Sequence, residues 1–418
     1  MIKLSTTFSE YNAKLTYYLY LLLAFCIPIH KKILPFVIAI LILNWLLGFN
    51  FKSKFNSVIH NRSLLVLITL YVFYLIGIIY SKDLSYAEND IAVKASFVIF
   101  PIILCESFLL PLYKIKNIFF IFIIGCFSNC IVQLIHAFIM FKQTHSKDEF
   151  FYNELSWSFH PAYYAMYICF IITLLIYYLF FDGSFHPKKQ KVLATALVIF
   201  FSIYIILLNS KAGIISLGLL YFISLIYYFI RFKKLILIFS VALGIGGSFF
   251  AFQHYLINPI NPRLELAKEN IEIKHIDSTT TESTNARILV WKASLEIIND
   301  NYLFGVGTGD VKDVLLAKYK EKGMTGAFNE QLNSHNQFLQ TFIALGIPGF
   351  LLLLSIFVFP IINSFKTKNY ILFCFLLIVF LNFLTESMLE TISGVVFFAF
   401  FYSLLIANNN RKELLFKQ

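Results

Sequence analysis

The feature that most limits the fold of this chain is the recurrence of long apolar stretches from one end to the other. A helix needs about 20 mostly apolar residues to cross the hydrocarbon core of a bilayer. Of the 418 residues, 59% are hydrophobic and 14% are charged, whereas soluble domains carry about 25% charged residues. The pattern predicts an all-α polytopic membrane protein with about twelve transmembrane helices, at residues 14–29, 33–49, 64–80, 91–110, 117–141, 160–181, 192–208, 212–230, 235–253, 336–360, 370–386 and 391–407.

The predicted spans divide the chain into four parts. Residues 1–253 hold the first nine helices, 254–334 form one long polar loop, 335–407 hold the last three helices, and 408–418 form a tail. Ala286–Asn299, inside the loop, predicts a helix with one apolar face. That face is expected to contain Ile288, Leu289, Trp291, Leu295 and Ile298.

Basic residues predict the orientation in the membrane. Cytoplasmic loops are enriched in Lys and Arg, and most basic residues of the short loops lie on the side that carries the N-terminus. The short loops of the opposite side hold only Lys31, Lys32, Lys82, Lys142, Lys147 and Lys211. Both termini are therefore expected in the cytoplasm and the long loop outside. The net charge of +11 then reflects topology and predicts no nucleic-acid partner.

The cysteines predict no disulfide framework. All six lie in apolar runs, where buried thiols are the usual state. They are Cys26, Cys105, Cys126, Cys130, Cys169 and Cys374.

His335 is the strongest catalytic candidate, because it lies where the polar loop ends and an apolar helix begins. The free N–H groups of a helix start favour polar and anionic ligands, and Asn333, Asn336 and Gln337 flank the imidazole. A neutral imidazole there could act as general base on a hydroxyl. A polar residue that only caps the helix or stays solvated is the alternative.

Two cations on the same predicted face could hold a phosphate. Arg287 begins the amphipathic helix, and Lys211 lies between two spans in a tight turn or helix break. Arg binds phosphate with a bidentate fork and Lys binds it as a point charge. Alternatively, Arg287 is a solvated surface charge and Lys211 caps a helix end.

Charges within or beside apolar spans are functional candidates by default. They are Lys94, Glu106, Glu386 and Glu390. Glu386 and Glu390 would share a face if the helix continued through them; a solvated helix rim is the alternative. His160, before Pro161, could line the same cavity or simply cap its helix.

Two patterns predict no cofactor. Gly305, Gly307 and Gly309 follow a helix and loop without the strand that a nucleotide motif requires, so they predict a turn. No outer loop carries His, Cys, Asp or Glu at metal-ligand spacing. Neither a metal nor another cofactor is expected.

Together these residues resemble the bacterial O-antigen ligase and polymerase superfamily of polytopic membrane glycosyltransferases. The likeness rests on Ser334–Leu339 running into Leu345–Gly349, on Arg287 through Gly307, on His160-Pro161, and on the basic residue after Asn209-Ser210. This turn carries Lys211 where ligases usually have arginine, which keeps the charge but loses the bidentate fork.

The resemblance implies a GT-C-like membrane fold and a glycan donor linked to undecaprenyl pyrophosphate in the bacterial inner membrane. It implies metal-independent, inverting transfer to lipid A-core during lipopolysaccharide biosynthesis, on the periplasmic face. His335 would be the general base, Arg287 and Lys211 would take part in catalysis by binding the pyrophosphate, and Asn336, His160 and Glu386 would contact substrate. A polysaccharide polymerase that uses the same donor and another glycan as acceptor is the alternative, and a transporter or flippase is less favoured.

Overall fold

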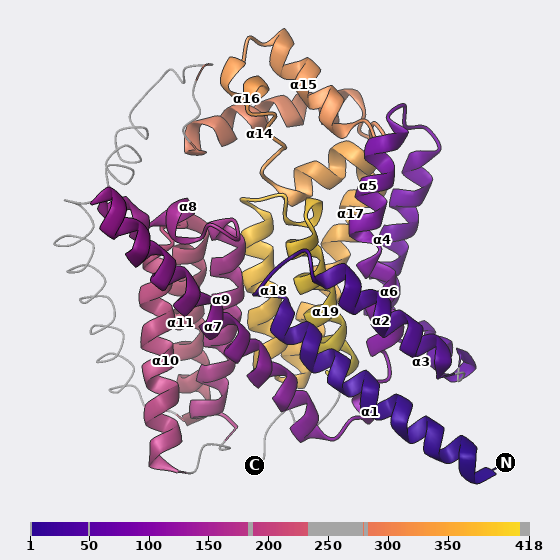
Figure 1. Cartoon of the computed structure of the whole chain (residues 1–418). Coiled ribbons are helices and arrows are strands. Elements are labelled where there is room, and N and C mark those ends of the chain that lie inside the picture. Colours follow the sequence, from indigo (N-terminus) through magenta and orange to yellow (C-terminus); the bar gives the residue numbers. More distant parts are fainter. Residues whose placement is uncertain (1, 49–50, 183–186, 233–278, 280–282, 410–418) are drawn as a thin grey trace.

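The computed structural model describes residues 2–48, 51–182, 187–232, 279 and 283–409, and every regular element within these residues is helical (Figure 1). Three are 3₁₀ helices: η1 Ser107–Leu109, η2 Lys147–Phe150 and η4 Met388–Glu390. The α-helices are α1 Ile2–Cys26, α2 Leu34–Leu47, α3 Phe51–Ile59, α4 Arg62–Ile78, α5 Leu84–Lys94, α6 Ser96–Leu104, α7 Leu112–Thr144, α8 Tyr152–Leu155, α9 Pro161–Phe180, α10 Lys188–Leu207, α11 Lys211–Phe232, α14 Ser283–Asp300, α15 Val311–Glu321, α16 Thr325–Asn329, α17 Gln337–Thr367, α18 Tyr370–Phe383 and α19 Ile392–Ala407.

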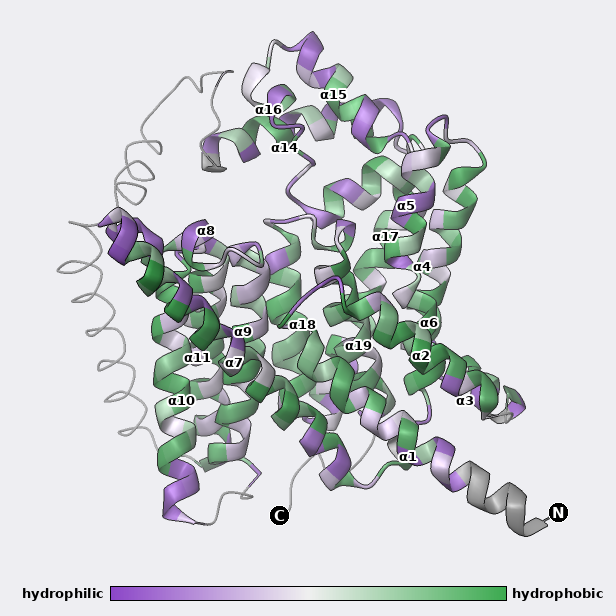
Figure 2. Ribbon diagram, viewed as in Figure 1, coloured by the Kyte–Doolittle hydropathy of each residue, from purple (hydrophilic) through white to green (hydrophobic). Residues whose placement is uncertain are grey.

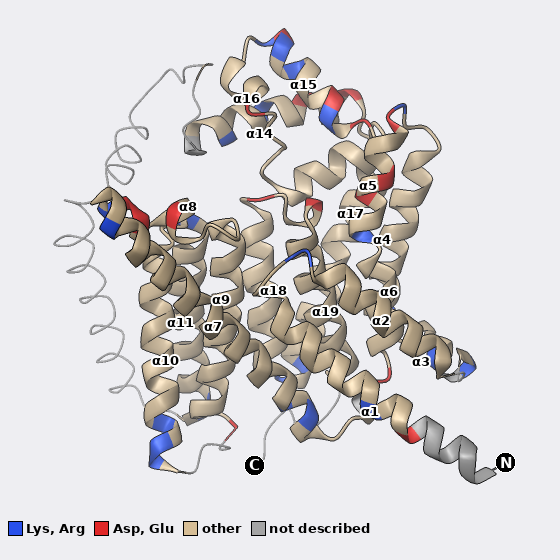
Figure 3. Cartoon of the chain, viewed as in Figure 1, with Lys and Arg blue, Asp and Glu red and all other residues tan. Residues whose placement is uncertain are grey.

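Apolar helices form a bundle, and a more polar layer made of α14, α15 and α16 covers one end of it (Figure 2). Most charged residues lie at helix ends, in loops and in this layer (Figure 3). Within the described residues, five helices are long and apolar enough to cross a membrane, namely α7, α9, α10, α11 and α17. Shorter apolar helices are α2, α4, α18 and α19. An all-helical fold with apolar, membrane-type helices is thus confirmed for the described residues, whereas the number of twelve spans stays a prediction.

Two predicted spans do not appear as single helices among the described residues. The span at 235–253 lies outside the described residues, as do most of the residues between it and α14. The span at 91–110 is not one helix, because α5 and α6 meet at Ala95 and α6 ends at Leu104. Only α6 is strongly apolar; α5 carries Glu88, Asp90 and Lys94.

The bundle centres on α9 and α19, whose side chains are almost all buried. Tyrosine hydroxyls of α9 bridge to its neighbours: Tyr164 donates to the carbonyl of Cys126 on α7 at 2.8 Å, and Tyr167 to that of Ser393 on α19 at 2.7 Å. In a membrane the hydrophobic effect does not drive helices together, because the lipid is as apolar as their side chains. Hydrogen bonds between helices therefore help to stabilise their packing. By contrast, α10 and α11 expose apolar side chains such as Ile199 and Phe222, as expected of helices that face lipid.

The predicted amphipathic helix is present as α14, and its buried face agrees with the expected one only in part, since Ile298 is buried but Leu295 is not. Leu295 is 55% exposed. The side chains that pack inward are small or β-branched, and they are Ala286, Val290, Ala293, Ile297 and Ile298. Sequence periodicity identified the helix correctly, whereas its rotation was set by how closely it approaches α15 and α17.

Helix α17 is broken in its first third, at Gly346, and the loop after α14 packs into the break. Pro348 has no N–H to donate to the carbonyl of Ala344 four residues earlier, and Gly307 donates to that carbonyl instead at 3.0 Å. Val306 donates to the carbonyl of Ile343 at 2.8 Å. The freed backbone groups are thereby satisfied, as broken membrane helices require.

Glycines make this close approach possible. Gly346 has φ 62°, and a Cβ on it would lie 2.5 Å from the Leu303 carbonyl. Gly305 has φ 72° and Gly307 has φ 101°, so the predicted glycine turn is confirmed. The non-helical residue of α17 is Gly346, two residues before Pro348. These glycines thus permit close contact between α17 and the loop after α14.

Candidate active site

The start of α17 holds the predicted base in a strained backbone conformation. Asn336 caps the helix, because its Oδ1 accepts from the backbone N–H groups of Phe338 at 2.9 Å and Leu339 at 3.1 Å. His335, one residue earlier, has a backbone φ of 44°, a value that residues other than glycine rarely adopt. Its N–H donates to Oδ1 of Asn333 at 2.9 Å. Two asparagines therefore fix the direction in which the imidazole projects.

Glu386 joins His335 to Arg287. Nδ1 of His335 lies 3.0 Å from one carboxylate oxygen, and Nη2 of Arg287 forms an ion pair with the other. Glu386 comes from the loop after α18, Arg287 from α14 and His335 from the residues before α17. The side chains of Arg287 and His335 are about one fifth exposed, whereas that of Glu386 is 7% exposed. We call Arg287, His335 and Glu386, together with His160, the Glu386 cluster.

The ionised Glu386 determines which ring nitrogen of a neutral His335 carries the proton. Burial raises the pKa of the Glu386 carboxyl, but the hydrogen bond to His335 and the charges of Arg287, His160 and His335 outweigh it, so the pKa is lowered overall. Glu386 is therefore ionised at neutral pH and can only accept. Nδ1 of a neutral His335 must then carry the proton, which leaves a lone pair on Nε2.

His160 is part of the same electrostatic environment. It caps α9, accepting from the N–H of Ala162 at 3.4 Å, and Pro161 occupies the first turn, as predicted. Burial lowers the pKa of its imidazole; the charge of Glu386 opposes this, while those of Arg287 and His335 add to it. The lowered pKa favours the neutral form of His160 within the Glu386 cluster.

Lys211 and Asn336 stay predictions as substrate contacts. Lys211 is the first residue of α11, after the predicted break at Asn209, which has φ 46°. This end of α11 packs on α9, because a Cβ on Gly213 would lie 2.5 Å from that of Ala165. Lys211 thus lies near the end of α9 that carries His160. The amide of Asn336 serves the α17 cap, and its Nδ2 donates to the Leu384 carbonyl at 3.1 Å.

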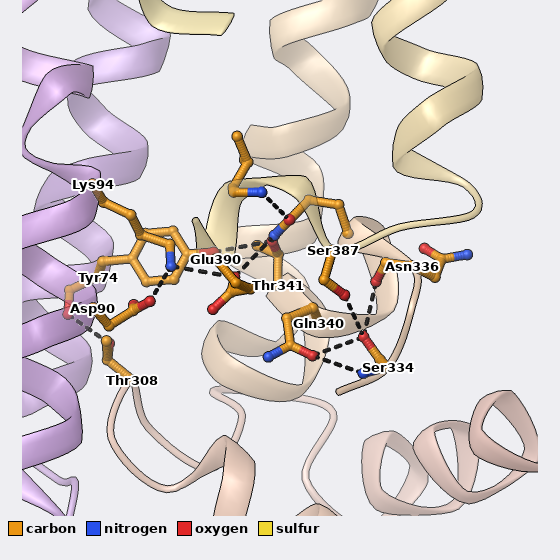
Figure 4. Close-up of polar contacts among 12 residues, drawn as sticks. Tyr74, Asp90, Lys94, Thr308, Ser334, Asn336, Gln340, Thr341, Ser387 and Glu390 are labelled. Atoms are coloured by element: carbon orange, nitrogen blue, oxygen red, sulfur yellow. Dashed lines mark hydrogen bonds and ion pairs between the residues drawn. The ribbon is translucent and has the colours of Figure 1, made fainter. Parts of the chain in front are cut away.

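Helix α18 does not continue through Glu386 and Glu390, so the condition under which they would share a face is not met. Helix α18 ends at Phe383, and the loop turns Glu390 toward Lys94, whose Nζ lies 3.2 Å from its Oε1 (Figure 4). Lys94 also pairs with Asp90 one turn earlier on α5 and lies over the Tyr74 ring, 4.7 Å from its centre.

Hydrogen bonds tie this second group to α17. Gln337 donates to Oε1 of Glu390 at 3.3 Å and accepts from the N–H of Leu389 at 2.7 Å. Tyr74 bonds to Thr341 at 3.0 Å. We call Asp90, Lys94, Glu390, Tyr74 and Gln337 the Lys94 cluster. Lys94 is fully buried.

Sequence reasoning missed a hydroxyl network between the two clusters. The hydroxyl of Ser334 donates to Oε1 of Gln340 at 2.7 Å and lies 3.3 Å from that of Ser387 (Figure 4). It fixes the residue before His335 against the residue after Glu386. No spacing rule connects positions 334 and 387, so only the fold reveals the contact.

The described residues contain no cluster of side chains that could bind a metal ion. None of their His, Cys, Asp and Glu side chains come together in threes that could hold an ion. Metal independence therefore stays a prediction. All six cysteines are buried and free, in agreement with the sequence.

Fold and site together define a membrane-type helical protein with a histidine–carboxylate–arginine cluster at one end of its bundle. A family model described as "O-Antigen ligase" matches residues 196–354. This match confirms the resemblance to the O-antigen ligase family and covers Lys211, Arg287 and His335, while His160 and Glu386 lie outside it. No curated protein matches the chain.

Proposed function

We propose that the chain is an O-antigen ligase-type glycosyltransferase that moves a glycan from undecaprenyl pyrophosphate to a hydroxyl of an acceptor glycan such as lipid A-core. The observation that carries this proposal is the contact of His335 Nδ1 with the ionised Glu386. It is the arrangement that a general base needs, since a carboxylate sets the tautomer and stabilises the imidazolium that forms.

The base step uses Nε2 of His335. It removes the proton from the acceptor hydroxyl while the oxygen attacks the anomeric carbon of the donor. The bond from that carbon to the phosphate oxygen breaks, and the electron pair leaves with the pyrophosphate. Attack opposite the leaving group inverts the anomeric centre. A positioned base typically contributes about 10²–10⁴-fold to such a reaction.

Cations stabilise the leaving group in this proposal. Arg287 has five N–H donors on its guanidinium, so an ion pair through Nη2 is compatible with phosphate binding. Lys211 supplies a second positive charge from α11. Charge that develops on the pyrophosphate is then neutralised by fixed cations, without a metal ion.

The site lies at the end of the bundle that α14–α16 cover, opposite the end where α1 begins and α19 ends (Figure 1). We assign that end to the periplasmic face of the inner membrane and both termini to the cytoplasm. A Lys320→Cys variant tests the assignment, because Lys320 is exposed on α15 whereas the native cysteines are buried. Labelling by an impermeant maleimide from the periplasm is expected, and labelling only after lysis contradicts it.

Transfer by the purified full chain, with lipid-linked donor and lipid A-core as acceptor, tests the activity. The His335→Ala protein should lose at least about 100-fold in rate, while His60→Ala, an exposed histidine outside the site, should keep it. Undiminished transfer by folded His335→Ala protein would refute the catalytic role.

Two further tests address the metal and the type of reaction. Chelation of divalent ions should leave the rate unchanged. In a strain that lacks this protein, a ligase predicts that the glycan polymer accumulates on its lipid carrier. A polymerase predicts instead that single glycan units are still attached to the acceptor.

A further inference from the structure

A cavity beside the Glu386 cluster is lined in a way that differs from the rest of this apolar chain. Its volume is about 360 Å³, at the lower end of the range for small-molecule sites. The residues that line it are all aromatic or polar, and no aliphatic side chain is among them. They include Lys31, Asn153, Trp157, His160, Tyr163 and Thr391.

Trp157 presents an aromatic surface to this cavity. It lies between α8 and α9 and is 55% exposed, although it is among the largest apolar side chains. One side of the indole packs on the His136 ring, with centroids 5.3 Å apart, which holds the ring in place. The negative face of an aromatic ring attracts weakly positive C–H groups such as those on one side of a pyranose.

Polar side chains complete the lining. Asn153 is exposed and offers both a donor and an acceptor, and Thr391 contributes a hydroxyl. Lys31 is the lining residue with a full charge, and no Asp or Glu is among the residues that line the cavity. This chemistry suits a ligand rich in hydroxyl groups, either neutral or acidic. An acyl chain would need aliphatic walls, and a polyphosphate would need more cations.

His160 connects the cavity with the Glu386 cluster. Its ring lines the cavity and contacts Tyr163, with centroids 5.7 Å apart, while its ionisation responds to Glu386, Arg287 and His335. A ligand in the cavity would therefore lie next to the reacting groups. We propose that this cavity is a saccharide subsite in which a sugar ring stacks on Trp157 and bonds to Asn153 and Thr391.

This proposal rests on the proposed function, because the sugar is taken to belong to the donor glycan or to the acceptor. Binding is tested without turnover. A W45F/W291F protein keeps Trp157 as the sole tryptophan, and it is titrated in detergent with methyl glycosides of glucose, galactose, N-acetylglucosamine and glucuronic acid. We expect a saturable change in its emission with at least one of them.

The control is a W157F/W291F protein, which keeps Trp45. That indole packs on Phe51, with centroids 5.2 Å apart, outside the cavity lining. Its emission should not change. No saturable response from Trp157 with any glycoside, or equal responses from both proteins, overturns the proposal.

Kinetics distinguish the two sources of the sugar. Trp157→Ala should raise the KM of either donor or acceptor about tenfold, with kcat changed much less; the substrate whose KM rises is the one that enters the cavity. Trp157→Phe should retain most of the affinity, and Tyr113→Ala, an exposed aromatic at the start of α7, should change neither KM. Unchanged KM values in Trp157→Ala refute the subsite even if His335→Ala is inactive. Full activity of His335→Ala refutes the base and leaves the binding result standing.

Discussion

The Glu386 cluster and the Lys94 cluster are built on two carboxylates only four residues apart and about equally buried, yet the basic side chains that pair with them differ in exposure. In the Glu386 cluster, Arg287 and His335 remain about one fifth exposed, so a substrate can reach them. In the Lys94 cluster, the Lys94 side chain is fully buried and that of Glu390 is 10% exposed. The same short loop thus supplies one carboxylate to the proposed reaction and another to a contact between α5 and α17.

Burial determines what each ion pair can do. A buried charge pair contributes little net stability, but removal of one partner leaves the other charge uncompensated and is costly. A partly exposed cluster can exchange its contacts with a ligand at lower cost. The comparison predicts that substitutions in the Glu386 cluster reduce activity, whereas substitutions in the Lys94 cluster reduce stability.

The largest effect is expected for Glu386→Gln. The amide keeps the shape but no longer fixes Nδ1 of His335 as the donor, so kcat should fall about 10²–10⁴-fold with little loss of folded protein. Initial rates of purified protein measure this. Glu390→Gln is the matched control, with a smaller effect on kcat per folded molecule. Equal losses of kcat in the two variants would break the comparison.

Lys94→Ala should destabilise the protein by about 3–5 kcal/mol, because Asp90 and Glu390 lose their shared cation inside the bundle. The fraction of monodisperse protein after heating in detergent reports the loss. A Lys94→Met/Asp90→Asn/Glu390→Gln triple variant removes all three charges and should recover most of the stability. Recovery of stability without recovery of transfer would show that the buried charges also act in the reaction.

Gly346→Ala tests the broken helix α17, which begins directly after His335 and supplies Gln337 to the Lys94 cluster. A side chain there has an unfavourable φ and meets the Leu303 carbonyl, so a loss of about 1–3 kcal/mol is expected. Gly218→Ala is the control, since a Cβ at that position in α11 has no atom within 4 Å. It should be neutral or slightly stabilising. A Gly346→Ala protein as stable as Gly218→Ala would contradict the role of the break.

The smallest effect is expected for Asn336→Ala, between His335 and Gln337. Loss of the cap should cost about 1 kcal/mol. Because the cap orients residues of both clusters, the variant should show a modest fall in both thermal stability and kcat, measured on the same preparation. Asn369→Ala, which removes the cap of α18, should lower stability alone. A kcat unchanged by Asn336→Ala would show that Asn333 suffices to orient the imidazole.

Much of the fold could be predicted because each span, cap and turn depends on residues adjacent in sequence. The apolar stretches predicted the membrane-type helices, His160-Pro161 predicted the start of α9, and the glycines predicted the turn after α14. Local patterns could not give the rotation of α14 or the end of α18 before Glu386, because both depend on packing against distant helices.

The candidate site divides in the same way. The sequence by itself singled out His335, Arg287, Glu386 and His160 as polar groups at helix starts and loops, since charged and polar residues are rare in such an apolar chain. Only the tertiary structure decided that Glu386 bridges His335 to Arg287 while Glu390 turns away to Lys94. Contacts between residues 51 or 296 positions apart follow from how the helices pack. No local propensity encodes them.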